Sequence, residues 1–202
     1  DVIVGYTVYI ELLKEHFPDK RYLTTSMRQE AERCRMAFEE AKKGAVTAMV
    51  CSGDAGIYGM AGLMYEIGEE YPEVAIDVIP GVTAALGGSA VLGAAVGHDV
   101  SLISLSDLLT PWELIEERLR CAAKGDFVIC LYNPSSRKRS TYLAKACELM
   151  LEYKPEDTVC GIVKNIAREG EAMQTLTLKE LKETAVDMFS TVFIGNKQTK
   201  II

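Results

Sequence analysis

The sequence predicts an α/β protein made of two domains. Apolar strand-like runs alternate with helical patterns along the chain, a glycine-rich turn follows one of the strands, and the alternation restarts after residues 93–99. Strands that alternate with helices imply sheets covered by helices on both faces. We therefore expect an N-terminal α/β domain over residues 1–97 and a C-terminal α/β domain over residues 98–202, with a cleft between them.

The first domain opens at Asp1–Gly5 on a strand that is already under way. Ser26 and Gln29 form a capping-box pattern at the start of a helix, and Gly44 is a typical helix stop. The other elements follow from the apolar periodicity. We expect helices over residues 8–16, 26–43, 57–70 and 84–95, and strands over residues 45–51 and 74–79.

The second domain has a strong helix start at Thr110, which we expect to be the N-cap, followed by Pro111 at the first helical position. This helix should end at Gly125, and two further helices should run to about Glu152 and from Thr177. Apolar runs predict strands over residues 100–105, 127–131, 158–164, 172–176 and 191–194.

The composition is that of a globular protein of 202 residues, with 49% hydrophobic and 25% charged residues. No apolar run reaches the length of a membrane span, so no membrane partner is expected. The chain carries 29 acidic and 22 basic residues, a net charge of −7. Because nucleic-acid phosphates need an extended basic surface, this balance argues against a nucleic-acid partner.

The cysteines and histidines do not form a metal-binding pattern. Six cysteines include no C-x-x-C pair, and the two histidines, His16 and His98, lie far apart in the sequence. Four of the cysteines fall in apolar strand or helix patterns: Cys51, Cys121, Cys130 and Cys147. We expect reduced core thiols in a cytoplasmic protein, and no metal site.

The segment Val50–Ala61 is the most informative stretch of the first domain. It follows an apolar run and contains three glycines, Gly53, Gly56 and Gly59, before a helical pattern. Glycines let a backbone approach a ligand closely, and a helix start offers free N–H groups to a carboxylate or a phosphate. The spacing matches neither common phosphate-binding motif. A ligand loop and a tight structural turn both fit this pattern.

The basic run Arg137, Lys138 and Arg139 follows a strand of the second domain. Adjacent cations are usually a solvated surface loop. However, α/β sheets bind ligands at the carboxyl ends of their strands, and guanidinium groups pair well with carboxylates and phosphates. Binding of a polyanionic substrate is the alternative reading.

Five motifs follow one another along the chain, at residues 52–59, 80–84, 104–112, 132–139 and 163–171. In this order and spacing they resemble the tetrapyrrole (corrin/porphyrin) methylase family, and the likeness covers essentially the whole chain. Within that family the motifs are most similar to the branch that methylates carbon 17 of a precorrin in cobalamin biosynthesis.

The chain departs from the family pattern in two places. Family members usually begin with a strand and a G-x-G-P-G turn ahead of the segment that matches Asp1, and no residues here match that turn. We therefore expect that roughly one strand, a loop and a helix are missing, about 30–35 residues at ordinary element lengths. Ala55 stands where many relatives have proline, which makes the loop less rigid.

The resemblance implies that S-adenosylmethionine binds in the cleft between the two domains. Matched positions at the methionine end and ribose are Ser52, Gly53, Asp54 and Ile57. A second contact pair is Thr83 and Ala84, for which a plain helix cap is the alternative. Asn133 and Ile166 match positions around the adenine.

The resemblance further implies methylation at C17 coupled to contraction of the macrocycle, in a homodimer. Methyl transfer needs mainly positioning and exclusion of water, because the sulfonium is already activated. Contraction moves protons and a ring-bound oxygen, and the side chains that could assist are Ser106, Asp107, Thr110 and Tyr132. Arg137, Lys138 and Arg139 would pair with the acetate and propionate groups of the precursor. The alternatives are another methylase of this fold and a non-catalytic tetrapyrrole-binding module.

Overall fold

The computed structural model describes residues 1–136 and 138–202, and these form two compact units, Asp1–Thr83 and Ala84–Ile202. Each unit is a mixed α/β structure with its own sheet, which confirms the predicted fold class. The division falls ahead of the boundary expected at residues 97 and 98. The reason is that the helix beginning at Ala84 packs on the second sheet, where Ala85 is buried together with Val163 and Phe193.

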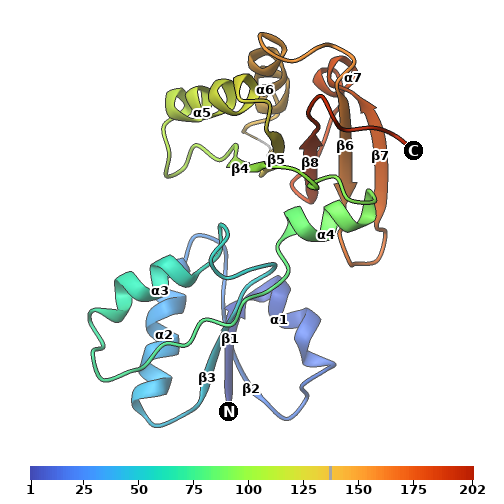
Figure 1. Ribbon diagram of the computed structural model, residues 1–202. Helices are drawn as coiled ribbons and strands as arrows, with labels where there is room; N and C mark the ends of the chain where they lie inside the picture. Colours follow the sequence, from blue (N-terminus) through green and yellow to red (C-terminus); the bar gives the residue numbers. More distant parts are fainter. Residues whose placement is uncertain (137) are drawn as a thin grey trace. The chain divides into compact units, whose positions relative to one another are not determined.

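The first unit has a parallel three-stranded sheet with helices against it (Figure 1). Strand β1 is central and pairs with β2 on one side and β3 on the other. Phe38 and Tyr71 stack at 4.8 Å between ring centroids in one of its two small apolar clusters. The elements are β1 (Val2–Tyr6), α1 (Thr7–Lys14), β2 (Arg21–Thr25), α2 (Glu30–Lys42), β3 (Thr47–Val50) and α3 (Ala61–Gly68).

The second unit has a mixed five-stranded sheet in the order β4-β5-β8-β6-β7. Strand β4 runs parallel to β5, whereas β8 lies antiparallel between β5 and β6. The last strand in the sequence therefore occupies the middle of the sheet, and all five of its residues are buried. The elements are α4 (Ala84–Val91), β4 (Val100–Ser104), α5 (Trp112–Lys124), β5 (Val128–Tyr132), α6 (Tyr142–Leu151), β6 (Val159–Lys164), β7 (Ala172–Thr177), α7 (Leu178–Lys182) and β8 (Ser190–Ile194).

This topology determines where ligands can meet the second sheet. Strands β5 and β6 are both antiparallel to β8, so they point in the same direction, and β4 points the same way as β5. The carboxyl ends of β4, β5 and β6 consequently share one edge. This is the edge at which open α/β sheets bind ligands.

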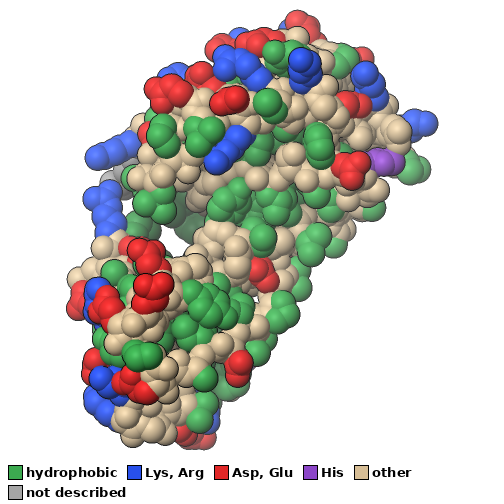
Figure 2. All heavy atoms as spheres, turned by 60° about the vertical axis from the view of Figure 1, so that its left-hand side comes forward, with side chains coloured by type: hydrophobic (Ala, Val, Ile, Leu, Met, Phe, Trp, Pro, Cys, Tyr) green, Lys and Arg blue, Asp and Glu red, His purple; other side chains and the backbone are tan. Residues whose placement is uncertain are grey.

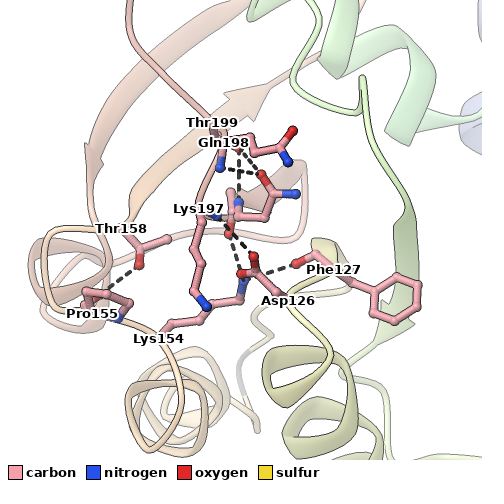
Figure 3. Close-up of polar contacts among 10 residues, drawn as sticks. Asp126, Phe127, Lys154, Pro155, Thr158, Lys197, Gln198 and Thr199 are labelled. Atoms are coloured by element: carbon pink, nitrogen blue, oxygen red, sulfur yellow. Dashed lines mark hydrogen bonds and ion pairs between the residues drawn. The ribbon is translucent and has the colours of Figure 1, made fainter.

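A buried lysine links three segments at the opposite edge of the second sheet (Figure 3). The Lys154 side chain is 2% exposed, and its Nζ donates to the carbonyl oxygens of Phe127 and Gly195 at 3.1 and 2.9 Å and to Asp126 Oδ1 at 3.3 Å. Three acceptors offset the loss of water around the ammonium group. Lys154 thereby joins the end of α6 to the start of β5 and the end of β8.

Charged side chains of both signs lie close together on the surface of the first unit (Figure 2). Arg35 pairs with Glu70 at 2.9 Å and Lys42 with Glu73 at 3.4 Å. These pairs are about half exposed, so each contributes little to stability. No helix in the described part of the chain is long and apolar enough to span a membrane.

Several predicted boundaries in the first unit were wrong. The helix expected over residues 57–70 starts only at Ala61, because the Ala61 N–H turns back to the Ala55 carbonyl at 2.9 Å. Residues 74–79 form no strand. Val74 and Ile76 instead pack against the cluster of Phe38 and Tyr71. Strand β2 was not predicted at all.

Three helix ends also differ from expectation. The helix predicted from Ser26 begins at Glu30, although the Ser26 backbone N–H still donates to Gln29 Oε1 at 3.0 Å. Helix α4 ends at Val91, because Gly93 and Ala94 adopt positive φ. At α5 the N-cap is Pro111 rather than Thr110, and no side chain caps this helix. By contrast, Thr177 forms the full capping box of α7 with Glu180.

Candidate functional site

Two sequence motifs meet at the carboxyl edge of the second sheet. The register pairs Ser104, the last residue of β4, with Tyr132, the last residue of β5, and the ladder continues with a bond from Leu105 N to the Tyr132 carbonyl at 2.9 Å. The segments 104–112 and 132–139 therefore leave the sheet side by side. Their closeness follows from the parallel pairing of β4 and β5.

Arg139 lies at the centre of a polar cluster on this edge. Its Nη1 donates to Ser106 Oγ at 3.1 Å and to Asp107 Oδ1 at 3.4 Å. The other oxygen of Asp107 accepts a hydrogen bond of 2.7 Å from the Tyr142 hydroxyl. Among the described residues, the buried Nε of Arg139 has no hydrogen-bond partner. The Arg139 side chain is 14% exposed, so this cation is largely withdrawn from water.

The hydrogen bonds of the cluster shift its titrations. The Tyr142 hydroxyl, followed by Arg139, lowers the pKa of Asp107, and the bond to Asp107 raises the pKa of Tyr142. At neutral pH the cluster therefore holds a carboxylate, a guanidinium and a neutral phenol. The Tyr142 ring also packs on Trp112 at 4.3 Å between centroids, which fixes its orientation.

Tyr132 and Asn133 hold neighbouring segments in place at the end of β5. The Tyr132 hydroxyl accepts from the Ala85 N–H at 2.8 Å, which ties the first turn of α4 to this strand. Asn133 adopts φ 52°, and its Nδ2 donates to Ser104 Oγ at 2.9 Å. The side chains of Ser104 and Asn133 thus lock the turns after β4 and β5 together.

Ile166 lies on the same sheet edge, in the turn after β6. It packs against the cluster of Ala85, Val163 and Phe193. Gly88 of α4 has no room for a side chain, because a Cβ there would lie 2.7 Å from Phe193 and 3.1 Å from Ile166. The small residues of α4 therefore permit close packing against β8 and the turn after β6.

In the first unit, the glycine loop after β3 is braced by Asp54. One Asp54 oxygen accepts from the Gly56 N–H at 2.8 Å, and the other accepts from the Gly81 N–H at 2.9 Å. These bonds, that of Gly81 first, lower the pKa of Asp54. The segments 52–59 and 80–84, which are far apart in the sequence, are therefore joined in one structure.

At Gly81 the backbones of the two segments also come into close contact. A Cβ on Gly81 would lie 2.1 Å from the Gly53 carbonyl oxygen, and Gly53 itself has φ +74°. Gly59 is equally constrained, since its Cβ would lie 2.5 Å from the Ala55 carbonyl. These glycines are required by the structure of the loop.

The residues of the loop and of its neighbour segment differ in their exposure. Ser52 and Gly53 are exposed, Ile57 is half-buried, and Thr83 is buried at the end of the unit. The Asp54 carboxylate accepts hydrogen bonds from the backbone N–H groups of Gly56 and Gly81, which are uncharged donors. An ionised carboxylate beside exposed backbone is a suitable partner for a ligand that carries ammonium and sulfonium groups.

The structure brings some predicted residues together and leaves others apart. Ser106, Asp107, Arg139, Tyr132 and Asn133 gather on one sheet edge. Thr110 is half-buried in the next turn and does not cap α5, and Lys138 is exposed. Arg137 lies outside the described residues. No group of three acidic, histidine or cysteine side chains suited to a metal occurs in the described part of the chain.

The sequence interpretation missed two contacts of the candidate site. Tyr142 was not considered, although it holds Asp107, and the bond between Asp54 and Gly81 was not foreseen. Asp107 and Tyr142 are 35 positions apart. The sequence carried no signal for this contact, because it did not show that β4 and β5 are adjacent and parallel.

Comparison with known proteins first defines the class of protein. The fold matches that of a cobalt precorrin-4 methyltransferase with a TM-score of 0.75 over 96% of this chain and 83% of that one, at 20% identity. The chain belongs to the tetrapyrrole (corrin/porphyrin) methylase family, whose model matches residues 1–182.

Particular relatives narrow this class. The chain is 45% identical to a probable cobalt-factor III C(17)-methyltransferase of Salmonella typhimurium, over the whole chain and 84% of that protein. It is 37% identical to a precorrin-3B C(17)-methyltransferase of Sinorhizobium, over 98% of the chain and 79% of that protein. The crystal structure of the methyltransferase CobJ matches with a TM-score of 0.90 and 33% identity, over the whole chain and 85% of that structure.

Proposed function

We propose that this protein transfers a methyl group from S-adenosylmethionine to C17 of precorrin-3B or its cobalt-containing form, with contraction of the ring, in cobalamin biosynthesis. The observation that carries the proposal is the identity of 45% to a relative named for C17 methylation, spread over the whole chain. The polar cluster at the ends of β4 and β5 supports it, because both motifs of that branch contribute to the cluster.

The residues of the chain contribute binding and orientation to this reaction. S-adenosylmethionine supplies, when bound, a methyl group that is already activated by the sulfonium. We assign its methionine end and ribose to the loop of Ser52, Gly53, Asp54 and Ile57 with the neighbouring Thr83 and Ala84, and its adenine to the surfaces at Asn133 and Ile166. Holding the reacting atoms in line accounts for most of the rate gain.

Ring contraction also requires proton movement close to the macrocycle. The hydroxyls of Thr110 and Tyr132 are half-buried at or near the carboxyl edge of the second sheet, as are Ser106 and the end of β4. Among the predicted catalytic candidates, Asp107 is ionised and already held by two donors. The Ser106 and Tyr132 hydroxyls also accept hydrogen bonds, but unlike the ionised Asp107 they carry a proton of their own, so the hydroxyl groups are better able to donate a proton to the substrate.

Isotope labelling tests the reaction. The protein is incubated with precorrin-3B and S-adenosylmethionine carrying a carbon-13 methyl group, and the product is analysed by mass spectrometry and NMR. We expect one added methyl group, its signal at C17, and a contracted ring reported by a second label in the meso carbon. A label at C11, or an uncontracted product at full turnover, would indicate another methylase of this fold. Tight binding without any mass change would indicate a tetrapyrrole-binding module.

Assembly and location are further parts of the proposal. We propose a homodimer in the cytoplasm. The six free cysteines, four of which are buried, suit a reducing compartment. Light scattering coupled to size exclusion, and fractionation of cells that express the protein, test these two points separately.

A further inference from the structure

The Arg139 guanidinium is held by hydrogen bonds at Nη1, whereas its Nε has no hydrogen-bond partner among the described residues. Its Nη1 donates hydrogen bonds to Ser106 and Asp107. The Nε–H is buried and has no acceptor among the described residues. The hydrogen bonds that Arg139 makes to described residues leave Nη2 unused. Buried donors are almost always paired in folded proteins, so an unpaired one calls for an explanation.

The Nε and Nη2 edge of the guanidinium suits one kind of ligand group. The Nε–H and one Nη2–H of an arginine point in parallel and match the two oxygens of a carboxylate. Lysine, with a single rotating ammonium, cannot present this pair of donors. The peripheral acetate and propionate groups of a tetrapyrrole are carboxylates of the required kind.

The other residues of the cluster fix the direction of this edge. Asp107 and Ser106 hold Nη1 from one side, and the Tyr142 hydroxyl holds the second oxygen of Asp107 at 2.7 Å. Trp112 packs on the Tyr142 ring at 4.3 Å. Each of these contacts restrains the next, so the guanidinium plane is oriented before a ligand arrives.

We propose that Arg139 binds one peripheral carboxylate of the tetrapyrrole through its Nε–H and Nη2–H edge, and that Ser106, Asp107 and Tyr142 are positioning residues that hold this edge in place. The inference rests on the proposed function, because that function supplies the carboxylate ligand. The unliganded protein already bears the cost of the unpaired Nε–H, and the bound carboxylate removes it. A slight local shift is needed, since Nε is covered in this structure.

The surroundings of Arg139 suit the rest of such a ligand. Leu108 and Leu109, which follow Asp107 directly, are 75% and 99% exposed. A tetrapyrrole combines a broad apolar face with a rim of carboxylates. Exposed leucines beside an oriented arginine offer complementary contacts to both parts.

Substitution of Arg139 tests the inference by two independent readouts. Binding of uroporphyrin III, a stable octacarboxylate, is followed by absorbance titration, and methyl transfer to precorrin-3B gives KM and kcat. We expect Arg139→Ala to raise the Kd for uroporphyrin III and the KM for precorrin-3B, each by about tenfold to a hundredfold, in line with the loss of a charge-assisted pair. The KM for S-adenosylmethionine should stay at the wild-type value. Lys124→Ala, an exposed cation on α5, serves as the matched control.

Two further variants separate the fork geometry from the charge. Arg139→Lys retains the charge but not the fork of donors, and we expect its affinity for uroporphyrin III to be close to that of Arg139→Ala. Millimolar guanidinium chloride should restore binding in Arg139→Ala, whereas ammonium chloride at the same ionic strength should not. Wild-type affinity in Arg139→Lys would overturn the proposal. That variant also decides the matter if Arg139→Ala fails to fold.

Asp107→Asn and Tyr142→Phe test the positioning roles. We expect a higher KM for the tetrapyrrole with an unchanged pH profile of kcat. A loss in kcat with unchanged KM and a shifted profile would mean that Asp107 transfers protons, and would overturn its assignment. If the wild-type protein transfers no methyl group, and Arg139→Ala binds uroporphyrin III more weakly than the wild type does, the proposed function fails and the carboxylate site stands. If it transfers methyl groups and Arg139→Ala retains the wild-type KM, the carboxylate site fails alone.

Discussion

Single residues shape the first-unit loop through backbone contacts that no side chain could replace. Gly81 meets the Gly53 carbonyl where a methyl group would overlap it, and Asp54 bonds both segments. The sequence marked these residues as special through their glycine content. It could not tell whether the glycines face a ligand or each other, because both situations demand the same missing Cβ.

We predict that Gly81→Ala separates the two segments of this loop. Its Cβ would lie 2.1 Å from the Gly53 oxygen, so the backbone must move and the bond to Asp54 must stretch. Overpacking of this kind costs roughly 1–3 kcal/mol. Thermal denaturation should show the loss, and calorimetry should show weaker binding of S-adenosylmethionine.

The matched control for this substitution is Gly62→Ala, also in the first unit. Gly62 lies in α3, and a Cβ there would meet nothing within 4 Å. Alanine is the better helix former by about 0.5–1 kcal/mol, so this variant should be slightly more stable. Equal effects of the two substitutions would contradict the close backbone contact at Gly81.

Asp54 should make stability depend on pH in the acid range. Its bonds to the Gly81 and Gly56 amides lower its pKa below the ordinary value of 3.8. A carboxyl whose pKa is lowered by folding stabilises the protein above the unfolded pKa, and this contribution fades as the pH falls through the folded pKa. We expect the wild type to melt above Asp54→Asn at pH 6, with the gap closing below pH 3.8. Asp19→Asn, at an exposed position, controls for loss of a charge, and a gap independent of pH would refute the brace.

At the scale of elements, the sequence predicted most helices and strands, and it failed where tertiary contacts overrode local signals. Strands β4 to β8 were predicted within a residue or two, because apolar and β-branched residues run through each of them. Residues 74–79 have the same pattern but pack against the Phe38 cluster without joining the sheet. Strand β2 was missed because its sequence, Arg21–Thr25, contains polar residues and only partly buried apolar ones.

Two helix starts with similar sequence signals behave differently in the structure. The Thr177 hydroxyl accepts from the Glu180 N–H at 3.2 Å, whereas α5 has no side-chain cap. We predict that Thr177→Ala lowers the free energy of unfolding by about 1 kcal/mol and that Thr110→Ala changes it by less than about 0.5 kcal/mol. Chemical denaturation of both variants provides the measurement. A larger loss at Thr110 would place the cap of α5 where the sequence had put it.

At the scale of the whole molecule, the two units differ in the size of their cores. The second unit has a large buried apolar cluster, which includes Leu105 and Ile194, and a smaller one around Phe193, whereas the first unit has two small clusters. Amide protection follows the depth and continuity of burial. We predict that hydrogen exchange, followed by mass spectrometry, is slowest in β5 and β8 and markedly faster in β1, β2 and β3. Equal protection of β1 and β5 would show that the chain unfolds as one cooperative body.

The sequence predicted the class of the protein better than it predicted the contacts of the candidate site. The family and the fold class followed from the sequence. The gathering of two motifs at one sheet edge and the roles of the residues there did not, because they depend on strand pairing and on contacts such as that of Tyr142 with Asp107, between residues 35 positions apart. Patterns along a chain report periodicity, while hydrogen bonds between loops depend on the exact path of each turn.

The placement of β8 has a consequence for biosynthesis. Ser190–Ile194 are synthesised after β5 and β6, the two strands with which they pair, yet they form the middle strand of the sheet. Until then β4–β5 and β6–β7 exist as separate ribbons, each with an unpaired strand edge. Such edges invite association with other chains. A nascent chain of this protein must therefore wait for its final strand before its second sheet can close, and a chain terminated before Ser190 would leave both edges open.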